Sequence, residues 1–244
     1  MVGRGARTRA CRVETHLDTV VGGTTEEHQA TGRVVTCILE QPIWLDWARR
    51  LQAIAQSGLA YSPRQFDLDR YQAVRAIAAE MMAAGSASPM APIRDLFASQ
   101  AGQATPKVDV RAAVFREGRI LLVEERADGA WSLPGGWAEV EESPAESTAR
   151  EVREESGYEV RTVKLLALYD RNRHGPPPIP FHSYKIVFQC EVIGGTPALS
   201  HETSGVDWFA EDALPPLSAM RVTEKQVRRF FEHYRNPHWP TDFD

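Results

Sequence analysis

Apolar and polar residues repeat with two different periods along the chain, and this divides it into a helical part and an α/β part. Between residues 42 and 98 apolar residues recur every three or four positions, which is typical of amphipathic helices. From residue 108 onward, short apolar runs separated by turn residues indicate strands. Residues 1–40 show neither period. We expect a poorly ordered extension there, with one short strand at 34–39, unless translation begins further along the chain.

The helical part is expected to hold two antiparallel helices and a third, short helix at 92–98. Pro42 suits the first turn of the first helix, and Gly58 suits its end. Asp67 is a good N-cap for the second helix, and Gly85 closes it. The predicted apolar faces consist of Trp44, Trp47, Leu51 and Ile54 on the first helix, and of Leu68, Tyr71, Val74, Ile77, Ala78 and Met81 on the second. Because so small a helical unit seldom folds alone, these faces must pack on the rest of the chain or on a second copy.

The α/β part is predicted to begin with a hairpin and to end with a helix. Its expected strands are 108–115, 119–126, a short one within 129–136, 158–170, 181–192 and 206–210. The turn between the first two strands has the sequence Arg-Glu-Gly, which suits a tight hairpin. A capping box formed by Thr223 and Gln226 starts the closing helix at 223–235. One side of that helix carries Val227, Phe230, Phe231 and Tyr234.

A second predicted helix in the α/β part, at 144–156, is unusually acidic. Ser143 is its expected N-cap, and Gly157 suits a left-handed end. Glu151, Glu154 and Glu155 then lie on one side of the helix, where like charges repel. A divalent cation with oxygen ligands would relieve that repulsion. On the charge pattern alone, an ordinary solvated helix face is favoured over a metal site.

Composition bounds the kind of partner and the compartment. The 244 residues carry a formal net charge of −5, so there is no basic excess for nucleic acid, and an anionic substrate needs a metal or a few placed cations. Cys11, Cys37 and Cys190 are widely spaced, which argues against a disulfide framework or a zinc site. There is no signal-peptide pattern and no apolar run of about 18 residues. We therefore expect a cytoplasmic protein with no membrane and no specific nucleic-acid partner.

The acidic helix and the residues before it resemble the Nudix box, G-x5-E-x7-R-E-U-x-E-E-x-G-U, in which U is a bulky apolar residue. Gly136 is followed by five residues and Glu142, and seven more lead to the run from Arg150 to Gly157. The one departure is the last position, which is Tyr158 here. Residues 42–237 also resemble a bacterial Nudix subgroup that has a helical N-terminal domain.

The resemblance implies a fold, an activity and an assembly. The expected fold is an α/β/α sandwich with a mixed sheet, preceded by a small helical domain. The domains would be the extension at 1–40, the helical domain at 41–99 and the Nudix hydrolase domain at 100–244. The implied enzyme is a pyrophosphohydrolase that uses Mg²⁺ or Mn²⁺ to cleave a nucleoside diphosphate linked to another moiety, with ADP-ribose and CDP-choline as leading candidates. A homodimer through the N-terminal helices is implied as well, and Trp44 and Trp47 suit either that interface or an intramolecular core. The alternative is a regulator that binds nucleotides without cleaving them.

The resemblance also assigns roles to single residues. Glu151 and Glu155 would be the principal metal ligands, Glu154 a supporting ligand, and the Gly135 carbonyl a further one. Arg150 would orient the glutamates and pair with Glu142, while Gly136 and Gly157 would serve backbone turns. The catalytic set is then Glu151, Glu155 and Glu202. Either Glu151 or Glu202 is the candidate general base, and Glu202 is as readily an ordinary loop acid.

A substrate-binding group is expected at the end of the 158–170 strand and on the strand that follows. Its candidates are Arg171, Arg173, His174, His182 and Tyr184. The three loop residues offer charges to a phosphate or sugar, and the two strand residues share one face near the expected base. Solvated loop cations and half-buried sheet residues are the respective alternatives.

Overall fold

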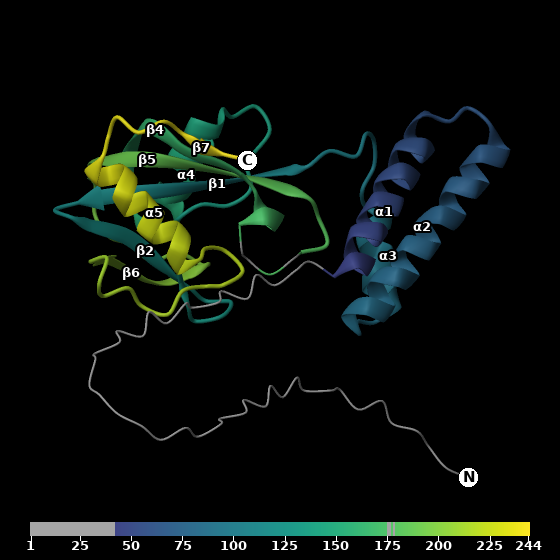
Figure 1. Cartoon of the computed structure of the whole chain (residues 1–244), viewed down its shortest axis with the longest axis horizontal. Helices are drawn as coiled ribbons and strands as arrows, with labels where there is room; N and C mark the ends of the chain where they lie inside the picture. Colours follow the sequence, from purple (N-terminus) through teal and green to yellow (C-terminus); the bar gives the residue numbers. More distant parts are fainter. Residues whose placement is uncertain (1–41, 175–176, 178) are drawn as a thin grey trace, which may run out of the picture. The chain divides into compact units, whose positions relative to one another are not determined.

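The computed structural model describes residues 42–174, 177 and 179–244, so the predicted extension and its strand at 34–39 lie outside the described residues. Three helices come first: α1 (Ile43–Tyr61), α2 (Gln65–Ser86) and α3 (Met90–Ala98). Figure 1 shows α1 and α2 running side by side along their length. No helix among the described residues is long and apolar enough to cross a membrane.

The faces predicted for α1 and α2 are partly wrong, because small residues make the tightest contact. The buried positions are Leu45, Ala48, Gln52 and Ala55 on α1, and Ala78, Ala79 and Met82 on α2. Alanines let the two helix backbones approach closely, so the larger side chains flank the contact. Trp47 stays 47% exposed, Ile54 57% and Ile77 49%. The predicted face is thus rotated by about one residue on each helix.

The two glycines expected to stop these helices lie inside them instead. Helix α1 runs past Gly58 to the residues before Pro63, and α2 contains Gly85 in its last turn. A Cβ at Gly58 would lie 2.4 Å from the Tyr71 ring, and one at Gly85 would lie 2.2 Å from the Trp44 ring. Each glycine therefore makes room for an aromatic ring of the neighbouring helix. The left-handed residue that ends α2 is Ala87, with φ of 52°.

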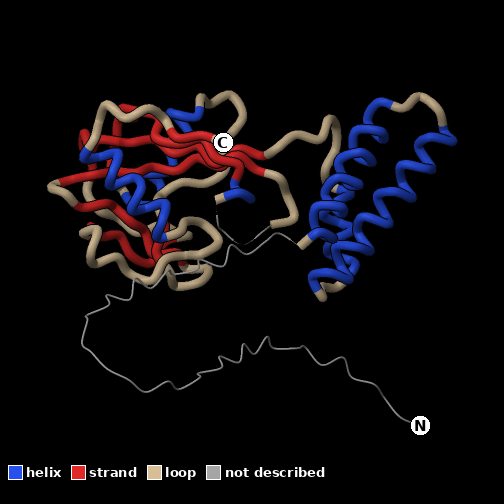
Figure 2. Tube along the Cα trace, viewed as in Figure 1, coloured by secondary structure: helices blue, strands red, loops and turns tan. Residues whose placement is uncertain are grey.

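The remaining chain forms a mixed sheet with a helix on each face (Figure 2). Its strands are β1 (Lys107–Arg116), β2 (Arg119–Glu125), β3 (Trp131–Ser132), β4 (Tyr158–Asp170), β5 (Ser183–Gly195), β6 (Thr203–Phe209) and β7 (Asp242–Phe243). The order is β3-β2-β1-β5-β4-β7, and β6 pairs with β2. The β1–β5 and β4–β7 pairs are parallel, and the other pairs are antiparallel. The α/β class and the mixed sheet are confirmed; β7 was not expected.

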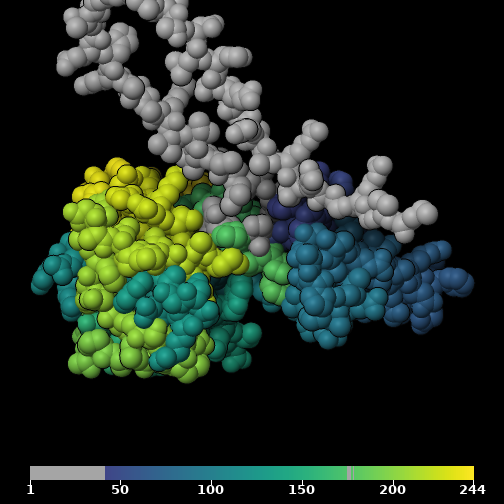
Figure 3. Space-filling view, turned by 90° about the horizontal axis from the view of Figure 1, so that it is seen from below, coloured from purple at the N-terminus to yellow at the C-terminus, as the bar shows by residue number. Residues whose placement is uncertain are grey.

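Alternate residues of β1 define the two sides of the sandwich. Ala112 and Val114 pack in one cluster with Val152 of α4 (Pro144–Ser156). Ala113 and Phe115 pack in the other with Phe230 and other residues of α5 (Glu224–Arg235). Figure 1 shows α5 lying across one face of the sheet, and the space-filling view shows how much of the surface the C-terminal third of the chain, green to yellow, provides (Figure 3). The sheet therefore places α4 and α5 on opposite faces, since side chains alternate along a strand.

Local signals fix the ends of these elements as expected. Both predicted capping boxes form, at the starts of α4 and α5. The hairpin turn between β1 and β2 has positive φ at Glu117 and Gly118, the pattern of a type I′ turn. Strand β7 is held by Asp242, whose carboxylate accepts hydrogen bonds from Arg229 at 2.6 and 2.8 Å. The C-terminal segment is thereby fixed beside β4.

Two substitutions near the end of α2 are predicted to change the stability of the protein in opposite directions. An alanine usually stabilises a helix interior by about 1 kcal/mol over glycine, but Gly85→Ala should destabilise the protein by about 1–2 kcal/mol because Trp44 must move. Ala87→Gly, two residues on, should stabilise it by roughly 0.5–1 kcal/mol because the left-handed backbone no longer strains a side chain. Urea denaturation followed by circular dichroism measures both. A stabilising Gly85→Ala would show that the ring contact imposes no constraint.

Candidate active site

The acidic helix α4 is held at both ends by its own sequence. The Ser143 hydroxyl oxygen accepts a hydrogen bond from the backbone N–H of Glu146, and the Glu146 carboxylate accepts one from the backbone N–H of Ser143. Gly157 ends the helix with φ of 74°. A Cβ at Gly157 would lie 2.4 Å from the Thr196 carbonyl oxygen, so only glycine fits there without rearrangement. This fixed helix presents Glu151, Glu154 and Glu155 about one turn apart, as predicted.

One guanidinium gathers the carboxylates. Arg150 Nε donates to both oxygens of Glu142, at 3.1 and 3.0 Å. Its Nη1 donates to Glu151 at 3.1 Å and to Glu154 at 3.0 Å. Glu142 is fixed in turn by the Ser147 hydroxyl at 2.7 Å, and the Ser147 and Arg150 hydrogen bonds lower the pKa of Glu142. The ion pair expected between Arg150 and Glu142 is present, and the orienting role of Arg150 stays a prediction.

The loop before the helix brings backbone groups to the buried end of the cluster. Pro134 and Gly136 accept backbone hydrogen bonds from Ala112 and Val110 of β1. Between them, the Gly135 N–H donates to Glu155 Oε2 at 2.9 Å. Gly135 has φ of 142°, and a Cβ there would lie 2.1 Å from the Val110 carbonyl oxygen. Glycine is therefore required at Gly135, where the chain passes between β1 and Glu155.

Burial raises the pKa values of the two innermost glutamates, Glu151 and Glu155. Desolvation raises the pKa of Glu155 to about 7, although the Arg111 charge and the Gly135 hydrogen bond oppose it. Desolvation also raises the pKa of Glu151, again against nearby arginine charge. Glu154 is half exposed. A cation placed among these carboxylates would favour their ionised forms and so would bind with release of a proton.

The donor set fits a hard divalent cation that keeps several positions for water and substrate. It offers carboxylate oxygens from three glutamates of the helix, and the Gly135 carbonyl stays a predicted further ligand. Across the described ranges, no three acidic, histidine or cysteine side chains already converge as a closed cage. The reason is visible in the contacts, since Arg150 holds Glu151 and Glu154 while Gly135 holds Glu155. Mg²⁺ and its analogues bind through few carboxylates and retain waters and phosphates, so an open arrangement suits them.

Glu202 lies in the loop that abuts the end of α4. The Thr203 hydroxyl, next in the chain, donates to the Glu155 carbonyl at 2.8 Å. The Glu202 side chain is 60% exposed and its Oε1 lies 3.2 Å from His201. The loop is thus close to the acidic helix while its carboxylate faces solvent. Its role as a general base stays a prediction.

The five predicted substrate-binding residues fall into different surroundings. Arg173 and His182 both approach Asp170, at 3.5 and 3.4 Å, and the His182 ring lies edge-on to Tyr184 at 5.3 Å. Tyr184 pairs with Asp170 in the β4–β5 register. These three are accessible, and they occupy the end of the sheet where β1 and β5 begin.

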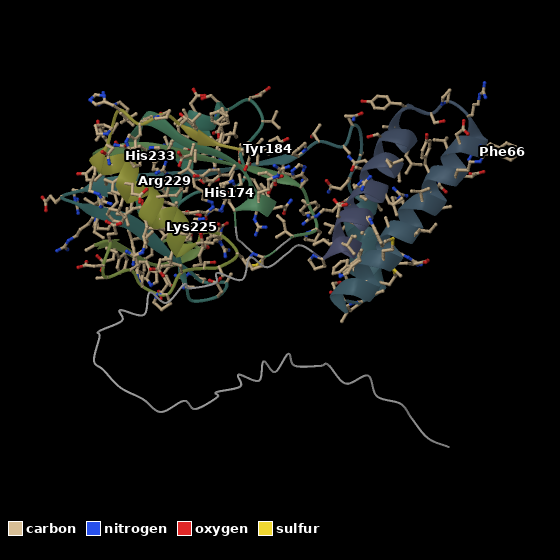
Figure 4. All side chains as sticks on the ribbon, viewed as in Figure 1. Phe66, His174, Tyr184, Lys225, Arg229 and His233 are labelled. Atoms are coloured by element: carbon tan, nitrogen blue, oxygen red, sulfur yellow. The ribbon has the colours of Figure 1, made fainter. Side chains whose placement is uncertain are left out.

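The other two predicted residues, His174 and Arg171, are less exposed. His174 stacks on Tyr169 at 3.8 Å, and its Nε2 lies 2.6 Å from Asp244. Figure 4 labels His174 and Tyr184 at the same end of the sheet. Arg171 is 4% exposed, and its terminal nitrogens donate at 2.7 Å to two backbone carbonyls, those of Pro177 and Met220. Their contact with substrate stays a prediction.

Sequence reasoning assigned no role to a buried charged cluster on β1 and β5. Asp109, Arg111 and Lys185 are 6%, 8% and 2% exposed. Arg111 Nε donates to Asp109 at 2.9 Å, and Lys185 Nζ lies 3.4 Å from the same carboxylate. Burial lowers the pKa of Lys185 to about 8. The signal was present in the sequence, since Asp109 and Arg111 occupy alternate positions of an otherwise apolar strand and so share a face.

Comparison with known proteins agrees with this geometry. A family model described as "NUDIX domain" matches residues 105–231, and one described as "UDP-X-like, N-terminal oligomerisation domain" matches residues 42–97. The "Putative ADP-ribose pyrophosphatase YjhB" of Bacillus subtilis (strain 168) is 46% identical over 204 residues, which cover 84% of this chain and 98% of that protein.

Two solved structures are similar as well. An ADP-ribose pyrophosphatase from Streptococcus suis 89-1591 is 39% identical with a TM-score of 0.53, and the match covers 57% of this chain and 100% of that one. A UDP-X diphosphatase is 30% identical with a TM-score of 0.54, covering 83% of this chain and 98% of that one. The second match includes the helical part as well as the α/β part.

The raised pKa of Glu155 predicts how stability depends on pH when a chelator removes metal ions. A carboxyl whose folded pKa lies above its unfolded value costs stability as pH rises from about 4.5 to about 7, and the cost is complete above that window. Glu155→Gln removes the cost but keeps an acceptor for Gly135. The variant should match wild type near the lower limit and exceed it by about 3 kcal/mol above the upper one. Urea denaturation across this pH range measures the difference, and a pH-independent difference would contradict the assignment.

Proposed function

The chain belongs to the Nudix hydrolase family, and we propose that it is a pyrophosphatase that uses Mg²⁺ or Mn²⁺ to hydrolyse ADP-ribose or a closely related nucleoside diphosphate sugar. The intact set of carboxylates around Arg150 is the observation that carries the proposal. The names of the relatives support the substrate class, since two are ADP-ribose pyrophosphatases by name and one is a UDP-X diphosphatase. CDP-choline is the next candidate.

The proposed mechanism assigns separate tasks to the residues of the acidic helix. Glu151, Glu155 and Glu154, with the Gly135 carbonyl, would hold the metal. When bound, the metal would neutralise phosphoryl oxygens and acidify a water. Arg150 and Glu142 keep the ligands aligned. In-line attack on a phosphoanhydride depends mainly on such positioning and charge neutralisation.

A carboxylate must also take the proton of the attacking water. Glu151 is one candidate, because burial raises its pKa toward the range of a useful base. Glu202 is the other, because its exposed carboxylate stands on a loop hydrogen-bonded to the end of α4. Glu202→Gln separates them, since loss of kcat without loss of metal affinity would assign the proton to Glu202.

Activity on a panel of nucleoside diphosphate derivatives tests the proposal. With Mg²⁺ or Mn²⁺, wild type should split ADP-ribose into two monophosphates, resolved by chromatography. Glu155→Gln should lower kcat by about 10³-fold or more, because a principal metal ligand is neutralised. Glu191→Gln is the matched control, since Glu191 makes an exposed ion pair with Arg161 and should retain full activity.

Two outcomes of the panel would count against the proposal. A folded wild type that hydrolyses none of the compounds would contradict it. If such a protein still bound one compound tightly, the alternative of a nucleotide-sensing regulator would take its place. Turnover of CDP-choline in preference to ADP-ribose would keep the reaction and change the substrate.

We also propose that the protein is a homodimer through its N-terminal helices. The matching model for residues 42–97 is described as an oligomerisation domain. Ile43, Trp47 and Ile54 lie on one side of α1 and are 63%, 47% and 57% exposed. Ile77 on α2 is exposed as well. Such a stripe of large apolar side chains is the usual character of an interface core.

Replacing one residue of this stripe tests the dimer. Ile54→Glu introduces a charge that would be buried between copies, so the protein should dissociate to monomers in sedimentation velocity. Ile193→Glu is the control, because Ile193 is 65% exposed on β5 and outside the helical part. Dissociation of both variants, or of neither, would contradict an interface at this stripe.

A further inference from the structure

The buried aspartate, glutamate, arginine and lysine side chains of the described residues form one network. They are Asp109, Arg111, Glu125, Glu155, Arg171 and Lys185. Arg111 and Lys185 share Asp109 as a partner, and Arg111 is electrostatically coupled to Glu155, Glu125 and Arg171. Burying charge costs several kcal/mol per ion, and an apolar replacement is often at least as stable. A network of this size therefore calls for an explanation beyond stability.

Only one of the two buried arginines has a terminal nitrogen without a partner in the described chain. Arg171 donates through both terminal nitrogens to backbone carbonyls. Arg111 donates through Nε to Asp109 and through Nη1 to the Leu133 carbonyl, at 2.9 and 3.1 Å. Its Nη2 donates to no residue that the structure describes, although the side chain is more than nine-tenths buried. Two contacts thus fix the guanidinium, and neither of them uses Nη2.

Arg111 is also connected to the predicted metal ligands through the loop that carries Gly135. Its own backbone lies between Val110 and Ala112, which hydrogen-bond to the residues on either side of Gly135. Its side chain donates a hydrogen bond to the backbone carbonyl of Leu133, two residues before Gly135. Its positive charge acts on both Glu155 and Glu151. The loop that carries Gly135 therefore links this guanidinium to the predicted metal ligands, because Leu133 contacts Arg111 and Gly135 contacts Glu155.

We propose that Arg111 contacts the substrate and that its Nη2 donates a hydrogen bond to a phosphoryl oxygen of the diphosphate. The inference rests on the proposed pyrophosphatase function and extends it to a residue outside the acidic helix. A diphosphate has more anionic oxygens than the metal side can cover, and arginine is suited to them through its planar fork of donors. Because Asp109 and Leu133 hold the guanidinium in advance, the contact needs little reorganisation as charge develops on the leaving phosphate.

Arg111→Lys tests the contact, with Arg116→Lys as its matched control on the same strand. Arg116 is exposed, and its guanidinium lies 4.2 Å from the Trp208 ring centroid and 5.6 Å from that of Tyr158. Among the described residues it forms no ion pair with the predicted metal ligands. We expect Arg111→Lys to lower kcat/KM for ADP-ribose by about 10²-fold or more, and Arg116→Lys to leave it unchanged. Lysine keeps the charge but cannot hold Asp109 and Leu133 while also reaching a phosphate.

Two binding measurements separate substrate contact from a purely structural role. Calorimetry with the non-hydrolysable α,β-methylene analogue of ADP-ribose should show at least a tenfold weaker affinity in Arg111→Lys. Mn²⁺ binding without nucleotide should stay within about threefold of wild type. If Mn²⁺ affinity falls and analogue affinity holds, Arg111 only positions the Gly135 loop and the proposal is overturned. Because these are equilibrium measurements, they remain decisive even if wild type turns over none of the panel.

A third measurement uses wild type and does not depend on the variant folding. In protein labelled with ¹⁵N-arginine, adding the methylene analogue with Ca²⁺ should shift the Arg111 side-chain signal and leave the Arg116 signal in place. Arg111 and Arg116 are assigned by comparison with the lysine variants, or by paramagnetic broadening from Mn²⁺ at the acidic helix if Arg111→Lys does not fold. An unshifted Arg111 signal at saturating analogue would overturn the contact.

Discussion

The site depends on one guanidinium that holds together carboxylates which would otherwise repel each other. Glu151 and Glu154 are less than one turn apart on α4, and Glu142 approaches from the preceding loop. Arg150 bonds all three, and its side chain is only 15% exposed, so water screens these contacts weakly. Glu155 is the one glutamate of the face that Arg150 does not bond, and it is fixed by Gly135 instead. The helix can therefore keep its acidic face ordered before any cation binds.

Much of the fold was predictable because its signals are local. The caps of α4 and α5 and the hairpin turn at Glu117 and Gly118 involve neighbours in sequence, and each formed as expected. The buried faces of α1 and α2 were not predicted correctly, because a hydrophobicity scale ranks tryptophan and isoleucine above alanine. Close helix packing favours the smallest side chains, and Ala48 and Ala78 therefore occupy the contact. The glycines failed as stop signals for the same reason, since each admits a ring from the other helix.

The candidate site divides along the same line. The acidic helix and its loop are contiguous, so a spacing pattern locates them. The resemblance of that pattern to the Nudix box implied the pairing of Arg150 with Glu142, which the structure contains. The cluster of Asp109, Arg111 and Lys185 exists only because β1 and β5 pair in parallel with Asp109 beside Lys185. Pairing between strands that lie this far apart in the sequence produces no local sequence pattern. What the sequence does show is two charged residues on one face of an apolar strand. In a central strand, this pattern indicates a buried ion pair.

Gly135 lies in a loop that contacts buried charges of both signs, the Glu155 carboxylate through Gly135 and the Arg111 guanidinium through Leu133. On one side are carboxylates, two of them with pKa values raised by burial, which disfavour ionisation until a cation arrives. On the other side is a buried guanidinium that Asp109 keeps charged. The proposed diphosphate substrate would use both, because a metal and an arginine neutralise different oxygens of the same anion. Neither half alone explains why the chain buries so many ions near one glycine, whereas an anionic ligand lying between the halves accounts for both.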